Sequence, residues 1–413
     1  MTTSTSDVFV HARFADGMSA IVGRYGFRKE RLDRNLGEFR YAASWLRNED
    51  GRSFALDPVN LPLSSQEFVT AKRGGLFGVL ADTTPDRWGL RLMRLTHQAP
   101  MSPADLLLAT GDERVGCLAF SQSPQSSVPT PAFLPFGTRV EIADAFDRIA
   151  RGENADPKFI ALYRAGQSLG GVRPKAVIEH DGHVWIAKFQ RHDDDIDQCA
   201  AEHASLRLAA ACGIEAAQTE LADVGGGRRA LLVKRFDRGG APAFPPTAHF
   251  ISALSLLDLE ETSLEGSYAQ IAGVLRQHGA AHARDREELF RRMLFNVLCG
   301  NRDDHLKNHA LLHNGNGWRL SPAFDVAPQT GIVERVQAIA VGVLGGIPTI
   351  DNCLSRAGEF GLSQEAAKEM ADGMIERMRG WREFFRAHGV PAATIGRLAQ
   401  VFAPVLAGKG RER

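Results

Sequence analysis

Residues 168–189, SLGGVRPKAVIEHDGHVWIAKF, place a glycine-containing loop directly before two apolar, β-branched runs. The two runs are joined by His180-Asp181-Gly182, and a short Asp-Gly connection between apolar runs is typical of a β-hairpin. The next segment, Cys199 to Cys212, is rich in alanine and leucine and is followed by Gly213, as a helix with a C-terminal glycine would be. The sequence therefore predicts a loop, a hairpin and a helix in that order.

The chain before this segment favours short strands. From Val8 to about Leu63, apolar and polar residues alternate, with breaks at glycine, aspartate and asparagine. A helix is expected over Asp86–Leu95, and Ser102-Pro103 provides the N-cap and first-turn proline of another. Residues 121–137, SQSPQSSVPTPAFLPFG, lack apolar periodicity, so we predict a linker there.

The chain after this segment becomes mostly helical. Two strands are expected on either side of Gly225–Gly227, and a hairpin at residues 309–320, HALLHNGNGWRL. Ser363 is expected to open a long amphipathic segment that runs to about His388. The predicted fold class is α+β, in four parts: a β-rich N-terminal subdomain (1–120), a linker (121–138), a lobe that carries the glycine-rich loop (139–236) and a helical lobe (237–413).

Composition excludes several classes of protein. The 44% hydrophobic and 24% charged residues are typical of a globular chain. Lys+Arg and Asp+Glu both number 49, so net charge indicates neither nucleic acid nor an anionic membrane as a partner. The five cysteines are scattered without a Cys-x-x-Cys pair, which argues against disulfide and zinc frameworks. The N-terminus, MTTSTSDVFV, does not resemble a leader, and no apolar run is long enough for a membrane span, so we expect a cytoplasmic protein.

Two motifs in the C-terminal half carry the residues that phosphoryl transfer needs: a base, oxygen ligands for metal ions, and cations against developing charge. In GNRDDHLKNHALL, residues 300–312, Asp303 precedes Asn308 by five positions, the spacing that presents a base to a hydroxyl and an amide oxygen to a metal. Asp304 is one residue out of register. Seventeen positions after Asn308, Asp325 in SPAFDVAP can supply a second metal-binding oxygen.

Each of these residues alone is also compatible with a structural role. An Asp-Asp-His triplet is often a solvated loop, and Asp325 alone could be a turn residue. The combination favours function, because the apolar helix FRRMLFNVLCG, residues 290–300, delivers the loop and a hairpin leads to the second aspartate. Within the loop, His305 is expected to orient Asp303, and Lys307 to neutralise a γ-phosphate.

Upstream residues fit a nucleotide site. The backbone amides of Gly170-Gly171 could cradle phosphates. Lys188 is an ammonium group within an apolar strand, so it should have an acidic partner. Glu202 on the following helix is the natural candidate, although an exposed helix charge is the alternative. The backbone of Lys234-Arg235-Phe236 lies where a hinge would contact adenine.

These motifs resemble those of the HipA-like serine/threonine kinase toxins of bacterial toxin-antitoxin systems. LFGVLADTTPDRWG, residues 76–89, resembles the N-terminal subdomain of that family. Five further segments resemble the kinase core of that family: SLGGVRPKA, WIAKF, VKRFDR, NRDDHLKNHALL and LSPAFDVAP. The Asp-x-His-x-x-Asn arrangement is also similar to that of phosphatidylinositol kinases. The resemblance implies a bilobal protein-kinase-like (HipA-like) fold with ATP and Mg²⁺ as cofactors.

The resemblance also assigns roles to residues. It implies Asp303 as catalytic base, assisted by Lys188 and Lys307, with Asn308 and Asp325 as Mg²⁺ ligands. Ser168 matches a serine that the family autophosphorylates, and a turn-capping serine is the alternative. The implied nucleotide-site residues are Gly170, Gly171, Val172, Arg173, Pro174, Lys175, Lys188, Glu202, Lys234, Arg235, Phe236, His305, Leu306, Lys307, Asn308, Phe324 and Asp325.

The resemblance implies partners as well. Protein targets of the family include aminoacyl-tRNA synthetases, and a helix-turn-helix antitoxin binds both the kinase and operator DNA. No such motif is recognisable in this sequence, so a separate antitoxin is expected, with DNA contacted only through it and no membrane. Two other interpretations stay open: a kinase of small molecules or phosphoinositides, and a nucleotide-binding pseudokinase that acts as a corepressor. The presence of all four of Asp303, Asn308, Asp325 and Lys188 argues against the pseudokinase.

Overall fold

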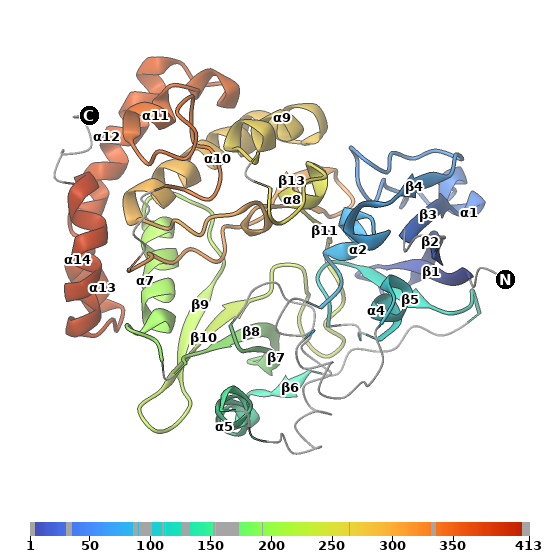
Figure 1. Ribbon diagram of the computed structural model, residues 1–413, viewed down its shortest axis with the longest axis horizontal. Helices are drawn as coiled ribbons and strands as arrows, with labels where there is room; N and C mark the ends of the chain where they lie inside the picture. The colour runs from blue at the N-terminus through green and yellow to red at the C-terminus, as the bar shows by residue number, and fades with distance from the viewer. Residues whose placement is uncertain are drawn as a thin grey trace. The chain divides into compact units, whose positions relative to one another are not determined.

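Figure 1 shows the helices and strands of the computed structural model. The chain forms two compact units, each assembled from three separate segments. Unit 1 comprises Met1–Ala187, Arg235–Glu260 and Leu312–Asn316. Unit 2 comprises Lys188–Lys234, Glu261–Leu311 and Gly317–Arg413. The structure describes residues 5–29, 35–85, 90, 101–109, 111, 113–125, 133–151, 153, 173–191, 193–263, 265–331 and 336–406.

A five-stranded antiparallel sheet dominates the N-terminal part of unit 1. Its order is β4-β3-β2-β1-β5. The strands are β1 (Thr5–Arg13), β2 (Ser19–Lys29), β3 (Asn35–Tyr41), β4 (Phe68–Thr70) and β5 (Leu118–Ser121). Val8, Val10 and Ala12 are fully buried at every second position of β1, because successive side chains of a strand point to opposite faces. The strands predicted from Val8 onward are therefore confirmed as far as Tyr41.

Beyond Tyr41 the prediction of strands up to Leu63 is wrong. Residues Ala43–Arg47 form the short helix α1, and the following segment is largely irregular. The reason lies in Trp45, whose ring packs edge-on against Phe54 at 5.4 Å between centroids and donates a hydrogen bond to its carbonyl. The short helix α1 places the Trp45 indole in the core. The alternation of apolar and polar residues in the sequence does not distinguish such a helical turn from a strand.

The remaining elements of unit 1 are short. They are η1 (Lys72–Gly74), α2 (Gly78–Ala81), α4 (Pro103–Ala109), β6 (Leu134–Pro135), η2 (Phe136–Thr138), α5 (Arg139–Ala150), β11 (His249–Ser252) and α8 (Ala253–Leu256). The predicted cap of α4 is confirmed, because Ser102 Oγ accepts a hydrogen bond from the Asp105 amide at 3.2 Å. The end of the serine- and proline-rich stretch is not free, since β6 pairs in parallel with the strand at Ile178. The helix predicted over Asp86–Leu95 lies outside the described residues apart from Leu90.

The predicted hairpin is confirmed by β7 (Lys175–His180) and β8 (His183–Phe189). Asp181 and Gly182 have φ values of 49° and 70°, the two positive values that a type I′ turn requires. Val177 and Val184 are buried and belong to a cluster with Phe244. This tight turn fixes the register of β8 and hence the direction of the lysine near its end.

Unit 2 begins at the end of β8 and continues with the predicted helix and two strands. These are α7 (Gln198–Ala211), β9 (Thr219–Asp223) and β10 (Arg229–Lys234). Asp197 caps α7 by accepting a hydrogen bond from the Ala200 amide at 2.9 Å, and Gly213 follows the helix with a φ of 85°. β9 and β10 are antiparallel, and α7 packs against both (Figure 1).

The rest of unit 2 is mostly helical, as predicted. Its elements are α9 (Tyr268–His278), α10 (His282–Cys299), η4 (Leu306–Asn308), β12 (Ala310–His313, which ends in unit 1), β13 (Trp318–Leu320), α11 (Ile350–Leu354), η5 (Ala357–Phe360), α12 (Gln364–Met378), α13 (Trp381–Ala387) and α14 (Ala392–Leu406). The central helix is α10, which contacts α9, α11, α12 and α14. No helix in the described part of the chain is both long and apolar enough to cross a membrane.

Two helix ends in unit 2 bear on the predictions. Ser363 caps α12 as expected, and the amphipathic segment predicted to about His388 consists of two helices, α12 and α13, because the chain breaks at Gly380. The break allows Trp381 to stack on Phe402 of α14, with 4.1 Å between centroids. At the end of α10, Gly300 takes a φ of 71° and fits closely against Val401. A glycine is needed there, and it releases the chain into the 301–308 loop.

Candidate active site

The 301–308 loop, which follows α10, is held by hydrogen bonds to its own backbone carbonyls. The Asn301 carbonyl accepts from Gln337 Nε2 at 3.0 Å, and the Arg302 carbonyl accepts from the Ala338 amide at 3.1 Å. The Asp303 carbonyl accepts from Asn308 Nδ2 at 3.1 Å and from the His305 amide at 2.9 Å. The loop is thus fixed while the Asp303 side chain stays accessible.

Lys188 lies between two carboxylates of unit 2. Its Nζ is 2.5 Å from Glu202 Oε1 and 2.7 Å from Asp325 Oδ1. The ion pair with Glu202 that the sequence predicts is therefore present, and it joins the end of β8 to α7. Burial works against the charged ammonium, yet attraction by Asp325 and Glu202 raises the pKa of Lys188 above its usual value. Lys188 is accordingly a fixed cation in this site.

Asp325 adopts an unusual backbone conformation. Its φ is 57°, in the left-handed region that aspartate tolerates better than most residues do. This turn directs the carboxylate toward Lys188 at the point where the chain leaves β13. Phe324, the residue before it, lines a small cavity behind the loop. The preceding residue thus faces inward while Asp325 faces the ammonium.

Negative charge accumulates around Asp303. Packing on the inner side of the loop removes water from its carboxyl group and raises its pKa. The nearby His305 opposes this rise, whereas the negative charges of Asp325 and Asp304 add to it. A carboxylate whose pKa is raised is a stronger base than a fully solvated one.

The arrangement fits a magnesium ion that is shared with phosphates. Asn308 turns its amide nitrogen toward the Asp303 carbonyl, which leaves Oδ1 as the coordinating atom. Asp325 offers carboxylate oxygens, so both candidate ligands are of the oxygen type that Mg²⁺ prefers. Within the ranges that the structure describes, no group of three or more His, Cys, Asp or Glu side chains is arranged to hold a metal. Two protein ligands are typical of Mg²⁺ sites that take their other ligands from phosphate and water.

Three other residues of the loop, Lys307, Leu306 and His305, lie in different surroundings. The Lys307 ammonium forms an ion pair with Glu261, so in this structure it is directed at a carboxylate of the same unit. The Leu306 side chain is buried, and a Cβ atom on Gly266 would lie 2.8 Å from its Cδ1. Leu306 is thus a packing anchor, and only its backbone is available to a nucleotide. His305 is half-buried, and its Nδ1 has no hydrogen-bond partner among the described residues.

The predicted glycine-rich loop lies mostly outside the described residues, since Ser168, Gly170, Gly171 and Val172 are among those not described. Arg173, Pro174 and Lys175 are described and belong to unit 1, where Pro174 and Lys175 are buried at the start of β7.

The predicted hinge contains a buried arginine. Lys234 ends β10, while Arg235 donates to Asp237 through Nη2 at 2.6 Å and to the carbonyls of Glu113 and Arg114. Its guanidinium is therefore engaged within unit 1, and Arg235 could contact a nucleotide only through its backbone. Phe236 follows it in the same unit.

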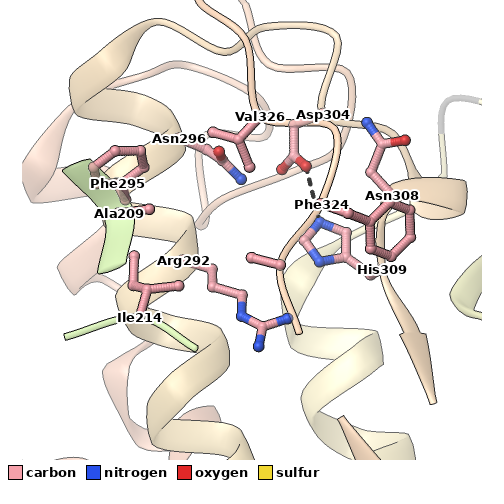
Figure 2. A pocket seen from close by; sticks show the side chains of 11 residues that line it. Ala209, Ile214, Arg292, Phe295, Asn296, Asp304, Asn308, His309, Phe324 and Val326 are labelled. Atoms are coloured by element: carbon pink, nitrogen blue, oxygen red, sulfur yellow. Dashed lines mark hydrogen bonds and ion pairs between the residues drawn. The ribbon is translucent and has the colours of Figure 1, made fainter. Parts of the chain in front are cut away.

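Sequence reasoning missed the residues beneath the 301–308 loop. Figure 2 shows Asp304 pointing inward toward His309, with their hydrogen bond drawn. Tyr268 and Asn296 complete this group from α9 and α10. The cavity beside it is lined by Ala209, Ile214, Arg292, Phe295, Asn296, Asp304, Asn308, His309, Ala323, Phe324 and Val326. No local pattern of the sequence indicates this group, because Tyr268 lies 36 positions before Asp304.

Comparison with known proteins decides the family. The family model named HipA-like C-terminal domain matches residues 167–381, and that named HipA N-terminal domain matches residues 27–121. The chain belongs to the HipA family. The predicted resemblance is thereby confirmed over both halves of the chain.

Curated relatives match parts of the chain. The serine/threonine-protein kinase toxin HipA of Shewanella oneidensis is 24% identical over 272 residues, 58% of this chain and 59% of that protein. A Haemophilus influenzae protein is 28% identical over 134 residues, 30% of this chain and 39% of its own length. The chain thus spans well under two thirds of the curated relatives it matches.

A solved structure matches almost the whole chain. It is that of Shewanella oneidensis HipA in a complex with HipB and operator DNA, with a TM-score of 0.72 at 17% identity. The match covers 98% of this chain and 97% of that one. It shows that the chain has the HipA fold, a mixed α+β, kinase-like fold with a β-rich N-terminal region and a more helical C-terminal region, as predicted.

Proposed function

We propose that this chain is a serine/threonine protein kinase that transfers the γ-phosphate of ATP to a protein hydroxyl. The observation that carries the proposal is the grouping in unit 2 of an accessible Asp303 on a fixed loop with Asn308, Asp325 and the Lys188–Glu202 ion pair. Phosphoryl transfer is catalysed mainly by positioning and electrostatics, and these residues supply both.

Each residue has a separate part in the proposed reaction. The acceptor oxygen forms a bond to the γ-phosphorus as the bond to the β-phosphate oxygen breaks, and ADP leaves with that bonding pair. Asp303 accepts the hydroxyl proton, and Lys188 faces the nucleotide phosphates as a fixed cation. Asn308 and Asp325 would hold Mg²⁺, which supplies positive charge against the phosphate oxygens.

The remaining assignments rest on position in the sequence and on family membership. We propose nucleotide contacts from the loop at residues 170–175, from the backbone of residues 234–236, and from His305, Lys307 and Phe324. The four predicted parts of the chain, with boundaries at residues 120, 138 and 236, remain part of this proposal. Ser168 is proposed as an autophosphorylation site. A phosphate there adds about −1.5 to −2 charge and can pair with Arg173, which would withdraw the loop amides from ATP.

The biological setting is proposed by analogy with relatives. The solved HipA is bound to HipB and operator DNA, and a curated relative is named a kinase toxin. We therefore propose a toxin of a toxin-antitoxin system that acts in the cytoplasm, with a separate DNA-binding antitoxin. Its target would be a cytoplasmic protein such as an aminoacyl-tRNA synthetase.

One experiment tests the activity against its alternatives. The purified chain is incubated with γ-labelled ATP, Mg²⁺, a mixture of protein substrates and phosphoinositide vesicles, beside Asp303→Asn. We expect label on protein, a loss of about 10²- to 10⁴-fold in the variant, and retained nucleotide binding. Label on lipid would support the phosphoinositide alternative, and nucleotide binding without any transfer would support the pseudokinase. Transfer that persists in excess EDTA would contradict the metal assignment.

A further inference from the structure

Asp304 is a buried carboxylate beside the accessible Asp303, and only 1% of it is exposed. It accepts a hydrogen bond from the Tyr268 hydroxyl and another from His309 Nε2, at 3.0 Å. Among the described residues, no lysine or arginine lies within ion-pair distance of it. A carboxylate is costly to bury unless it is well hydrogen-bonded, so a position of this kind requires its donors.

The donors of Asp304 are themselves held in place. Tyr268 is fully buried at the first turn of α9, and its hydroxyl accepts from Asn296 Nδ2 of α10 at 3.0 Å. Asn296 Oδ1 in turn accepts from Asn301 Nδ2 at 3.1 Å. The network thus runs from two helices into the start of the loop, and the side chains of Asp304, Tyr268, Asn296 and Asn301 are each hydrogen-bonded to the next.

The Asp304–His309 bond also closes the loop on itself. Asp304 follows the candidate base directly, and His309 follows the candidate metal ligand Asn308 directly. The His309 ring packs edge-on against Tyr268, with 5.0 Å between centroids, so both ends of this segment meet at one phenol ring. Fixing residues 304 and 309 limits the freedom of Asp303 and Asn308 together.

We propose that Asp304 is a positioning residue, which with Tyr268 and His309 holds the 301–308 loop so that Asp303 and Asn308 keep their relative placement. The inference rests on the proposed kinase function of this loop, and it adds residues that act through others and touch no substrate. Misplacing a reacting group by about 1 Å can cost about 100-fold in rate, so loss of the hydrogen bonds of Asp304 should lower kcat.

The test compares Asp304→Asn and Tyr268→Phe with Asp285→Asn in the full-length chain. Asp285 is a matched control: it is equally buried in unit 2 and is bonded to Arg319 and the Leu320 amide, on α10 well before the loop begins. We expect Asp304→Asn to lower kcat about 10- to 100-fold with the KM for ATP within about twofold of wild type. Asp285→Asn should lower stability but leave kcat per folded molecule unchanged.

Two further measurements keep the inference separate from the proposed function. Hydrogen exchange of the peptide that contains residues 301–309 should speed up in Asp304→Asn and not in Asp285→Asn, and this readout needs no activity. Tyr268→Phe should lower kcat in the wild-type background and have little further effect in Asp304→Asn. Should Asp304→Asn fail to fold, Tyr268→Phe carries the same two readouts. Unchanged loop exchange, or a stable variant with wild-type kcat, would overturn the inference, whereas a wild-type chain that transfers no phosphate refutes only the proposed function.

Discussion

Asp237 in unit 1 and Asp304 in unit 2 are both buried carboxylates, but their negative charges are stabilised by different kinds of partner. Asp237 lies between the guanidinium groups of Arg235 and Arg238, at 2.6 and 3.1 Å, and also accepts from the Gly116 amide. Asp304 accepts hydrogen bonds from the phenol of Tyr268 and the imidazole of His309. The comparison teaches that burial alone does not decide the partners of a carboxylate: Asp237 has two arginines, whereas Asp304, in the candidate active-site loop, has a phenol and an imidazole. A cation beside Asp304 would weaken the negative field at the site where Mg²⁺ is proposed to bind.

Asp57 in unit 1 extends the comparison to a buried carboxylate that, among the described residues, has no lysine, arginine or histidine partner. It accepts from the amides of Val59 and Asn60 at 2.9 Å and from the Asn60 side chain at 2.8 Å. Burial raises the pKa of Asp57 to about 6. For Asp237, burial acts in the same direction, but the two arginines overcome it and lower the pKa to about 2. The partners, and not burial itself, therefore decide which form of the carboxyl group is stable.

The largest expected effect is on the ion cluster of unit 1. Asp237→Asn leaves two buried guanidinium groups without their carboxylate, so the free energy of unfolding should fall by about 3–5 kcal/mol. Urea unfolding measures it. Asp7→Asn serves as the control, because the Asp7–Arg24 pair is exposed and should be worth at most about 1 kcal/mol. A loss in Asp237→Asn as small as that of the control would break the comparison.

A pH titration of stability should reveal Asp57. Its pKa is raised in the folded state, so the charged form costs the native state stability above pH 6, and the cost vanishes below the unfolded pKa near 4. The free energy of unfolding should therefore rise relative to Asp57→Asn as the pH falls from about 6 to 4. The gain is about 3 kcal/mol, from about two pKa units at about 1.4 kcal/mol each. Parallel pH profiles for the two proteins would show that the carboxyl group does not carry this charge cost.

Removing one uncharged hydrogen-bond donor should lower the free energy of unfolding by less than removing the charge of Asp237 does. Tyr268→Phe deletes the hydroxyl that donates to Asp304 and accepts from Asn296, so we expect a loss of about 1–3 kcal/mol in the free energy of unfolding. Thermal and urea unfolding give the value. A loss as large as that of Asp237→Asn would mean that the two kinds of neutralisation are energetically alike.

The smallest expected effect concerns the helix that carries Tyr268. Ser267 caps α9 by accepting from the Gln270 amide at 3.2 Å, and Ser267→Ala should cost about 1 kcal/mol. Because the phenol is also fixed by burial and by Asn296, kcat should change less than about twofold. Ser363→Ala at the cap of α12 is the matched control, since the described network residues Tyr268, Asn296, Asn301, Asp304 and His309 lie outside α12. A kcat that drops only in Ser267→Ala would show that the helix cap also helps to hold the 301–308 loop in place.

The sequence predicted best what depends on neighbouring residues. The hairpin turn at Asp181-Gly182, the end of α7 and the Lys188–Glu202 pair each follow from local patterns, and the structure contains them. The roles of Asp303, Asn308 and Asp325 stay predictions, although the structure brings Asp325 to Lys188. Asp304 could not be assigned, because its partner Tyr268 lies 36 positions away. The same limit hid the bonds of Arg235 to carbonyls more than 120 positions away.

The interleaving of the two units has a consequence for synthesis on the ribosome. Unit 1 is complete only when Leu312–Asn316 has been made, and by then the first two segments of unit 2 have been made in full. Neither unit can be isolated by cutting the chain once, so truncated fragments would expose apolar surface that its missing segments normally cover. Contacts between distant segments also raise contact order, which slows folding. Neither unit can therefore be completed during synthesis before about three quarters of the chain has been translated.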